Sequence, residues 1–488
     1  MRYSTCFISL GWLLIISAIA ALIPAACAFL FGEVEAGRGF LGGGLISAFA
    51  GGATLFSLRG ATIRARRHEL LLSLVMGWSI VPFFAAMPFV LSGATASFPE
   101  AYFEAVSGLT TTGATIFPNL DALPRSIILW RALLQWIGGF ATLAAVIALY
   151  PMLNIGGMRL FNNHLPHGEG DSLFDRVRGV VLATWQVYVL LTLVCMILLW
   201  VTGTPFFDGI CLALSTLSSG GFMPRDGSLS VYGNPFIEIV LIPFMAIAAL
   251  NFTLHRAFLE GRRRVYLRDP EVKRFLILSL IATVLLVLGL ETGLGAGGAN
   301  FAHLDSLRIG LFTAVSMVST TGFISGDAST FPLTPVLLIM PLILIGGATG
   351  STAGGIKLMR TWILTLHGDR EFWLLAHPHG VVNKSYGGSP VSAEVTASIW
   401  AFFILFILSL CAITLALAAA GLDLQSATSA ASASLSNTGP ALALMSPDLP
   451  GYWAISELGR WVLCVSMILG RLEVLPFLVL LSSVFWRA

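Results

Sequence analysis

Four segments of the chain share one arrangement of alanine, hydroxyl-bearing and glycine residues. They cover residues 105–113, 213–221, 314–322 and 431–439, and they align without gaps. Each begins with alanine and ends with glycine, and the final glycine recurs at separations of 108, 101 and 117 residues. Three residues before that glycine stand Thr110, Ser218, Ser319 and Ser436. Chance explains one such string, whereas four in register at near-even spacing indicate an internal repeat.

The chemistry that suits these segments is the binding of a dehydrated alkali cation. Backbone carbonyl and hydroxyl oxygens can replace the ion's water shell, and glycine turns carbonyls toward an axis at little steric cost. The strings contain no acidic residue, so the carboxylate ring that suits divalent ions is not expected. We predict a filter for a monovalent ion such as K⁺, formed by Thr111, Thr112, Gly113, Ser219, Gly220, Gly221, Thr320, Thr321, Gly322, Asn437, Thr438 and Gly439. Because Gly220 stands where the other segments have threonine, the sequence leaves open whether Gly220 or Gly221 is the key glycine.

A second candidate site interrupts the long apolar stretch 332–366. Its 35 residues are too many for one straight crossing, and ten small or polar residues break it at 346–355. Fourteen helical residues from Pro332 descend about 21 Å, which would place the break below the filter, lining the pore rather than facing lipid. The candidate residues are Gly346, Gly347, Thr349, Gly350, Ser351, Thr352, Gly354, Gly355 and Lys357. The rival interpretation is a phosphate-binding loop. Such a loop ends in Gly-Lys-Ser/Thr, whereas Ile356 precedes Lys357 in this chain.

Arg471 and Glu473 lie inside the last apolar stretch. A charge at membrane depth is costly, so such a residue faces a cavity or a charged partner. Because the two residues are two positions apart on a helix, they point in different directions and do not simply pair with each other. Arg471 is either part of the ion pathway or one half of a structural salt bridge between helices.

The composition requires most of the chain to lie in a membrane. Of 488 residues, 56% are hydrophobic and only 11% are charged, against about 25% charged in ordinary globular proteins. A formal net charge of +2 argues against a nucleic-acid binder. The N-terminal run exceeds the apolar core of a signal peptide, so we expect it to be retained as a helix. Ten spans are predicted, at 6–31, 40–58, 69–92, 126–150, 180–202, 235–255, 274–291, 332–366, 394–420 and 453–485.

The positive charges predict the orientation of these spans. With the N-terminus inside, cytoplasmic segments carry 20 of the 27 lysines and arginines. The outer segments carry six, which include Arg131, and Arg471 falls within a span. Since positive residues accumulate on the cytoplasmic side, both termini are predicted to be cytoplasmic.

The expected fold is an all-α polytopic membrane protein with four pseudo-fourfold repeats. Each repeat consists of a span, a short re-entrant pore helix, a glycine-containing loop and a second span. Acidic residues that favour helix N-termini stand near the expected starts of the pore helices: Glu100, Asp208, Asp305 and Asp423. The predicted units are two extra N-terminal spans at 1–67 and repeats at 68–165, 166–265, 266–380 and 381–488.

Cysteine and histidine give no convincing metal site. The six cysteines lie in apolar stretches without metal-ligand spacing. A cytoplasmic metal or catalytic site is conceivable from a looser group of residues, although solvated loop positions explain it better: His164, His167, His367, His377, His379, Asp171, Asp175 and Asp369. No catalytic constellation or large soluble domain supports a membrane enzyme or sensor.

The four glycine segments resemble the filters of the TrkH/TrkG/KtrB superfamily of potassium uptake proteins. The similarity covers nearly the whole chain, and the two extra N-terminal spans favour the TrkH/TrkG branch. It implies potassium uptake, not enzymatic activity, across a bacterial inner membrane, with K⁺ as the transported ion and no organic cofactor. It also implies that 346–355 is an intramembrane gating loop, that Arg471 lies under the filter, and that the protein forms homodimers regulated by a cytosolic nucleotide-binding ring, TrkA.

Two transport alternatives remain beside this interpretation. A sodium or mixed Na⁺/K⁺ transporter of the same superfamily would be favoured by serine in place of the first filter glycine, but Gly113 is present. A secondary transporter with inverted repeats is disfavoured because all four repeats have the same orientation. Coupling to H⁺ or Na⁺ does not follow from the residues.

Overall fold

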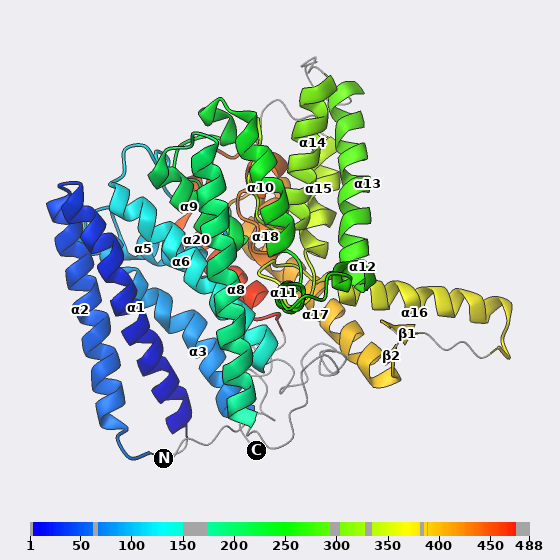
Figure 1. Cartoon of the computed structure of the whole chain (residues 1–488), viewed down its shortest axis with the longest axis horizontal. Coiled ribbons are helices and arrows are strands. Elements are labelled where there is room, and N and C mark those ends of the chain that lie inside the picture. Colours follow the sequence, from blue (N-terminus) through cyan, green and yellow to red (C-terminus); the bar gives the residue numbers. More distant parts are fainter. Residues whose placement is uncertain are drawn as a thin grey trace.

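The computed structural model describes residues 3–61, 67–149, 173–292, 303–326, 334–380, 385–387 and 389–474. This part of the chain is mostly helical (Figure 1). Seven of its helices are long and apolar enough to cross a membrane, and a bent pair raises the count to eight. The composition therefore correctly indicated a helical, multi-pass membrane protein, while the predicted total of ten spans exceeds what helix length and hydropathy identify in the described residues.

The N-terminal helices form a layer beside the remaining helices, at the blue end of the chain (Figure 1). Helix α1 (Ser4–Leu30) packs along α2 (Val34–Ser57), and both contact the broken span made of α3 (Arg67–Ala85) and α4 (Met87–Leu91). Glycines permit the close approach of α2 to α4. A Cβ atom at Gly39 would lie 2.6 Å from the Ser92 nitrogen, and one at Gly43 would lie 2.7 Å from Pro88 Cδ.

Four shorter helices correspond to the predicted pore helices. Three carry Glu100, Asp208 or Asp305 in the first turn, and Asp423 caps the fourth by accepting a hydrogen bond from the Ser426 nitrogen at 3.1 Å. These carboxylates complement the positive helix ends, as the sequence predicted. The helices are α5 (Phe98–Leu109), α9 (Phe206–Leu217), α14 (His303–Val318) and α18 (Leu424–Leu435).

Further helices flank the pore helices in the sequence. They are α6 (Arg125–Ala144) with its π-helical continuation η1 (Ala145–Leu149), α8 (Leu173–Val201), α10 (Pro235–Ala248), α11 (Phe252–Leu259), α13 (Pro270–Thr292), α15 (Thr334–Ile345), α16 (Leu358–Ala376), α17 (Ala393–Ala419) and α20 (Glu457–Arg471). The short elements are η3 (Leu229–Tyr232), α12 (Val265–Arg268), α19 (Ala441–Met445), η5 (Tyr452–Ala454) and the antiparallel strands β1 (Ser385–Tyr386) and β2 (Ser389–Pro390). Helix α16 runs away from the bundle, roughly across the direction of α13 (Figure 1).

The stretch 332–366 is broken where the sequence predicted. Helix α15 ends at Ile345, α16 begins at Leu358, and residues 346–357, called the inner loop below, connect them without helix. The prediction of a continuous span at 235–255 is wrong, because α10 and α11 meet at an angle of 102°. Asn251 starts the new helix by accepting a hydrogen bond from the Thr253 nitrogen at 2.9 Å.

The last predicted span, 453–485, is also interrupted. It begins with the short helix η5, and α20 ends at Arg471. Glu473 and Val474 then adopt left-handed backbone conformations, with φ of 55° and 58°, which end a right-handed helix. The rest of this span lies outside the described residues.

A substitution in α2 tests the packing of the N-terminal layer. We expect Gly43→Ile to force α2 away from Pro88 and to lower stability by about 1–3 kcal/mol, the usual cost of overpacking. Gly52→Ile is the control, since no atom lies within 4 Å of a Cβ at Gly52 in the same helix. Thermal unfolding of the purified variants in detergent measures the effect, and equal midpoints would contradict this packing.

Candidate ion-binding site

The four glycine segments share a backbone conformation. The residue two positions before the final glycine is left-handed in every segment, with φ between 52° and 57°. These residues are Thr111, Ser219, Thr320 and Asn437. Such a conformation is uncommon for residues other than glycine. Three of the four final glycines are also left-handed, with φ of 79° at Gly113, 78° at Gly221 and 81° at Gly322, whereas Gly439 is not. By conformation, Gly221 rather than Gly220 is the counterpart of Gly113.

The segments contact one another in the order of the chain, and the last contacts the first. A Cβ atom on the final glycines would lie 2.0, 2.1, 2.9 and 2.4 Å from an atom of the next segment or of the residue directly after it. A hydrogen bond of 2.6 Å from the Gly439 nitrogen to the Thr112 carbonyl oxygen closes the circuit. The four segments therefore form a closed ring of contacts, three through backbone atoms and one through the Pro440 side chain, with no space for a larger side chain at these positions. The residues in close contact are Gly113 with Gly220, Gly221 with Thr321, Gly322 with Pro440, and Gly439 with Ala114.

Hydroxyl groups brace three of the four segments internally. Thr110 and Thr112 share a hydrogen bond of 2.7 Å between their hydroxyl oxygens, and Ser319 and Thr321 share one of 2.8 Å. In the fourth segment the corresponding oxygens, on Ser436 and Thr438, are 3.3 Å apart. The second segment has Gly220 at the threonine position and so lacks this bond.

The side chain of Gln135 in α6 takes the place of the missing threonine. Its Nε2 donates to the Gly220 carbonyl oxygen at 2.8 Å, and its Oε1 accepts from the Ser215 hydroxyl at 2.8 Å. A Cβ at Gly220 would lie 2.3 Å from Gln135 Cδ, so the buried amide explains why glycine stands there. Sequence reasoning missed Gln135, although a lone amide within an apolar span was a usable signal.

A buried ion pair holds the chain that follows the first segment. Glu104 of α5 accepts a bond from Arg131 Nε at 2.6 Å and another from the Ile116 nitrogen at 3.0 Å. The Arg131 guanidinium also lies 4.1 Å from the Phe222 ring centre, just after the second segment. Arg131, assigned from sequence to an outer segment, is only 1% exposed. Its charge is neutralised inside the protein and carries no information about orientation.

The inner loop lies against the left-handed residues of the ring. The Thr352 and Ser219 hydroxyl oxygens share a hydrogen bond of 2.8 Å, and the Gly354 nitrogen donates to Thr320 Oγ1 at 2.7 Å. A Cβ at Gly354 would lie 3.3 Å from Asn437 Cβ. Three of the four segments therefore touch the inner loop directly, through hydroxyl groups or by close approach.

Arg471 connects the inner loop to the remaining segment. Its Nη1 donates to the Thr352 carbonyl oxygen at 2.9 Å, and its Nη2 donates to Thr111 Oγ1. The side chain is 4% exposed. The structure thus brings this sequence-predicted residue against both the glycine ring and the inner loop.

Other inner-loop residues contact the loop itself or the neighbouring helices α10 and α15. A Cβ at Gly346 would lie 2.2 Å from the Gly354 carbonyl oxygen, and one at Gly347 would lie 2.9 Å from that of Ala249. Gly355 approaches the end of α15, and Ser351 donates to the Ala348 carbonyl oxygen. These contacts shape the loop rather than the site.

The break in α10 receives the inner loop. The Ala348 nitrogen donates to the Ala249 carbonyl oxygen at 2.8 Å, and the Thr352 nitrogen donates to that of Ala248 at 3.2 Å. In return the Phe252 nitrogen donates to the Gly350 carbonyl oxygen at 3.1 Å. The loop satisfies backbone groups that a continuous helix would have paired internally, which is why the span at 235–255 can bend.

Four buried charged side chains surround the inner end of the loop. Arg360 pairs with Glu473, and the Lys357 ammonium donates to the Ala353 carbonyl oxygen. Lys357 is within electrostatic range of Glu473, Arg471 and Arg360. Glu271, whose carboxylate bonds the Thr349 nitrogen of the loop, is a second anion within electrostatic range of Lys357. The prediction that Arg471 and Glu473 point in different directions is confirmed, since they have different partners.

Carboxylates at the starts of the pore helices have polar partners. Asp208 pairs with Arg225 at 2.5 Å, and Glu100 pairs with Arg460 at 3.1 Å. Hydrogen bonds from Ser426 lower the pKa of the Asp423 carboxyl below its ordinary value, because they stabilise the charged form. These ion pairs and hydrogen bonds lie at the helix starts, the ends away from the glycine segments.

No cluster of three metal-ligating side chains occurs among the described residues. His164, His167 and Asp171 lie outside them, and His367 lies 3.8 Å from Glu371 in its own helix and packs edge-on against Trp400 of α17. The looser cytoplasmic group considered from sequence is therefore not assembled in the part of the chain that the structure describes.

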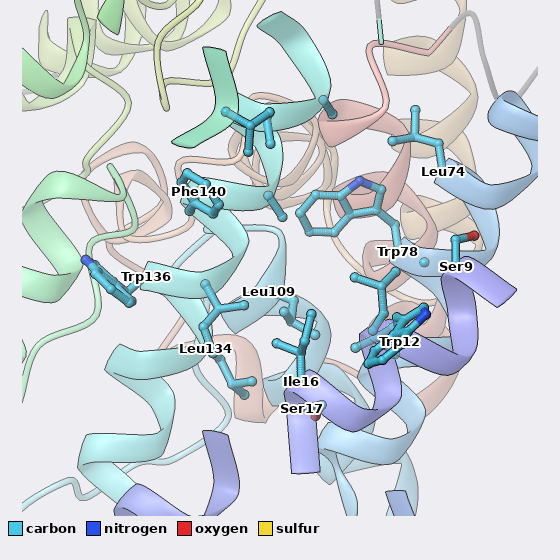
Figure 2. A pocket seen from close by; sticks show the side chains of 18 of the residues that line it. Ser9, Trp12, Ile16, Ser17, Leu74, Trp78, Leu109, Leu134, Trp136 and Phe140 are labelled. Atoms are coloured by element: carbon cyan, nitrogen blue, oxygen red, sulfur yellow. The ribbon is translucent and has the colours of Figure 1, made fainter. Parts of the chain in front are cut away.

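An apolar cavity of about 890 Å³ lies between α1, α3, α6 and α8 (Figure 2). Trp12, Trp78 and Phe140 line it, together with Leu109 at the end of α5. None of the residues that line it carries a charge. Although the cavity reaches the first pore helix, its chemistry does not suit a cation.

Comparison with known proteins gives consistent matches over the whole chain. The family model described as TrkH, cation transport protein, matches residues 37–486. The Trk system potassium uptake protein TrkH of Vibrio parahaemolyticus is 34% identical over all of both chains, and that of Escherichia coli K12 is 32% identical over 98% of both. The crystal structure of the potassium transporter TrkH from Vibrio parahaemolyticus superposes with a TM-score of 0.89 over the whole of both chains, at 32% identity.

The role assigned to Gln135 can be tested by stability. Gln135→Leu keeps the approximate volume but leaves the Gly220 carbonyl and the Ser215 hydroxyl without their buried partner. We expect a loss of about 1–3 kcal/mol for each group left unsatisfied, measured by thermal unfolding in detergent. Gln425→Leu is the matched control, because that amide makes one partly buried bond of 3.3 Å to the Met445 carbonyl oxygen. Equal losses in the two variants would contradict the proposed bracing.

Proposed function

The chain belongs to the family of TrkH cation transport proteins, and from this premise we propose that it takes up potassium ions through the glycine ring. The observation that carries the proposal is the closed circuit of four glycine segments, each contacting the next. A ring of backbone and hydroxyl oxygens can replace the hydration shell of a monovalent cation. With no carboxylate in the four segments, it favours a weakly hydrated ion such as K⁺ over a divalent ion.

We propose that the ring sits on a pseudo-fourfold axis of four span–pore-helix–span repeats. The shared left-handed turns and the acidic starts of the four short helices support this arrangement. The repeats are those expected from sequence, at 68–165, 166–265, 266–380 and 381–488, after two extra spans at 1–67. The ten spans expected from the sequence would then include the bent stretch 235–255 and the interrupted stretches 332–366 and 453–485.

The inner loop is proposed to be the gate. Its hydrogen bonds to Ser219, Thr320 and, through Arg471, Thr111 support a position directly under the ring. Arg471 adds an electrostatic barrier, because two unit charges about 4 Å apart interact by about 4 kcal/mol at an effective dielectric constant of about 20. Loop and arginine together oppose the passage of a cation.

The cellular setting follows from the same family. We propose a bacterial inner membrane with both termini in the cytoplasm, a homodimeric assembly, and control by a cytosolic nucleotide-binding partner of the TrkA type. Lysine and arginine on the segments assigned to the inside support this orientation.

Ion flux into liposomes tests the proposed conduction. At a fixed membrane potential we expect K⁺ and Rb⁺ to permeate at similar rates and Na⁺ more slowly. Each segment offers one left-handed or closely packed final glycine rather than a long stack of sites, so discrimination should be incomplete. Equal or faster Na⁺ flux would support the alternative, a sodium or mixed transporter of this superfamily, and no monovalent flux would reject both.

Gly113→Ser is expected to lower the K⁺/Na⁺ flux ratio. Its Cβ would lie 2.0 Å from the Gly220 carbonyl oxygen at a φ of 79°, so one quarter of the ring must shift. Gly52→Ser in α2, where space is open, controls for expression and reconstitution. An unchanged ratio in folded Gly113→Ser protein would remove this residue from the filter.

Arg471→Gln separates a barrier from a structural role. Glutamine keeps some volume and hydrogen bonding but removes the charge, and we expect K⁺ flux to rise several-fold, where about 1.4 kcal/mol corresponds to tenfold. A structural role predicts the opposite, since it leaves buried groups unpaired. Flux and thermal midpoint are measured on the same preparation. A fall in both would leave Arg471 as a structural residue only.

A further inference from the structure

One carboxylate joins the inner loop to the cytoplasmic hairpin formed by β1 and β2. Glu271 is the second residue of α13 and is 7% exposed. Its Oε2 accepts a hydrogen bond of 2.6 Å from the Thr349 nitrogen of the inner loop. Its Oε1 accepts one of 2.9 Å from the Tyr386 hydroxyl in β1. Two segments 37 positions apart in sequence, by these residue numbers, thus share one acceptor.

The position of Glu271 is fixed from the helix side. Asp269 caps α13 by accepting hydrogen bonds from the Glu271 nitrogen at 2.8 Å and the Val272 nitrogen at 3.0 Å. A carboxylate in the first helical turn is also favoured by the helix dipole. These capping bonds go to backbone nitrogens, so α13 fixes the backbone of Glu271, whereas the bonds to Thr349 and Tyr386 fix the direction of its carboxylate.

Tyr386 is held from a second side by a cation. The Arg274 guanidinium, one turn along α13, lies 5.4 Å from the Tyr386 ring centre and 3.7 Å from the Trp362 ring centre. Trp362 belongs to α16, the helix that continues the inner loop. The hairpin, α13 and α16 therefore meet around one glutamate and one arginine, and the same glutamate reaches the loop backbone.

We infer that Glu271 and Tyr386 form a latch that positions the inner loop in its closed state. The inference rests on the gating role proposed above and adds a regulatory contact to it. When the hairpin moves, the Tyr386 bond is lost and the carboxylate holds Thr349 less firmly. A partner that binds the cytoplasmic hairpin then acts on the gate through a single carboxylate, without contacting the loop itself. Glu271 and Tyr386 are positioning residues and do not touch the ion.

Tyr386→Phe is the sharpest test because it removes one hydroxyl and keeps the ring against Arg274. We expect K⁺ flux into liposomes to rise about three- to tenfold, the effect of a typical net hydrogen bond on an equilibrium. The K⁺/Na⁺ flux ratio and the thermal midpoint should stay unchanged. The matched control is Tyr232→Phe, whose hydroxyl also donates to a carboxylate, Asp208, at 3.2 Å, but near the start of a pore helix.

Hydrogen exchange gives a readout that does not depend on flux. We expect the amides of 346–357 to exchange faster in Tyr386→Phe than in wild type or Tyr232→Phe, with no change in α5. Glu271→Gln should have the same direction of effect, and the double variant should not exceed the larger single effect, because both substitutions break one latch. Wild-type exchange in the loop of Tyr386→Phe and Glu271→Gln would overturn the inference.

The latch and the gate can fail separately. If Arg471→Gln raises flux while Tyr386→Phe alters neither flux nor exchange, the gate stands and the latch is rejected. If Tyr386→Phe accelerates loop exchange but neither variant alters flux, the contact is a latch on the loop, and the gating role is what fails.

Discussion

Backbone groups inside a membrane must find hydrogen-bond partners within the protein, because the hydrocarbon offers none. The glycine ring and the inner loop both consist of irregular backbone that is buried inside the protein. Each satisfies part of the other's requirement. Gly354 donates to Thr320, Gly439 donates to Thr112, and the Gly220 carbonyl finds Gln135. The unusual features of the molecule, from the bent α10 to the buried arginines, are ways of meeting this constraint.

Buried charged side chains also need partners inside the protein. A buried ion is stable only when it is paired or hydrogen-bonded, and the buried arginines take partners that also fix the geometry. Arg131 neutralises Glu104 and lies against Phe222, so it ties the first glycine segment to the second. Arg360 takes Glu473, which leaves Arg471 directed toward the ring and the inner loop. The Arg471 guanidinium thereby joins the first glycine segment to the inner loop.

Features that recur within the chain could be predicted from the sequence. The alignment of the four glycine segments located the ring, and the run of small residues in 332–366 located the inner loop, because repetition and composition are local patterns. What could not be predicted depends on contacts between distant segments. Gln135 explains Gly220 only once α6 is known to lie beside α9, and no pattern links Glu271 to Thr349 or Tyr386. The bend after α10 was missed because one polar residue, Asn251, is a weak signal in an otherwise apolar run. The backbone groups freed by the bend are paired by the inner loop, about 100 residues later in the chain.

The junction of α10 with the inner loop has a consequence for water. The loop supplies the hydrogen bonds that the Ala248 and Ala249 carbonyl oxygens and the Phe252 nitrogen would otherwise make in a continuous helix. If the loop withdraws, these three groups remain at membrane depth and must be hydrated immediately. A withdrawal of the loop would therefore require water to enter the space that it leaves and to hydrate these three groups. If the loop moves as proposed for the gate, that movement carries water with it, and osmotic stress would shift the balance between its two positions.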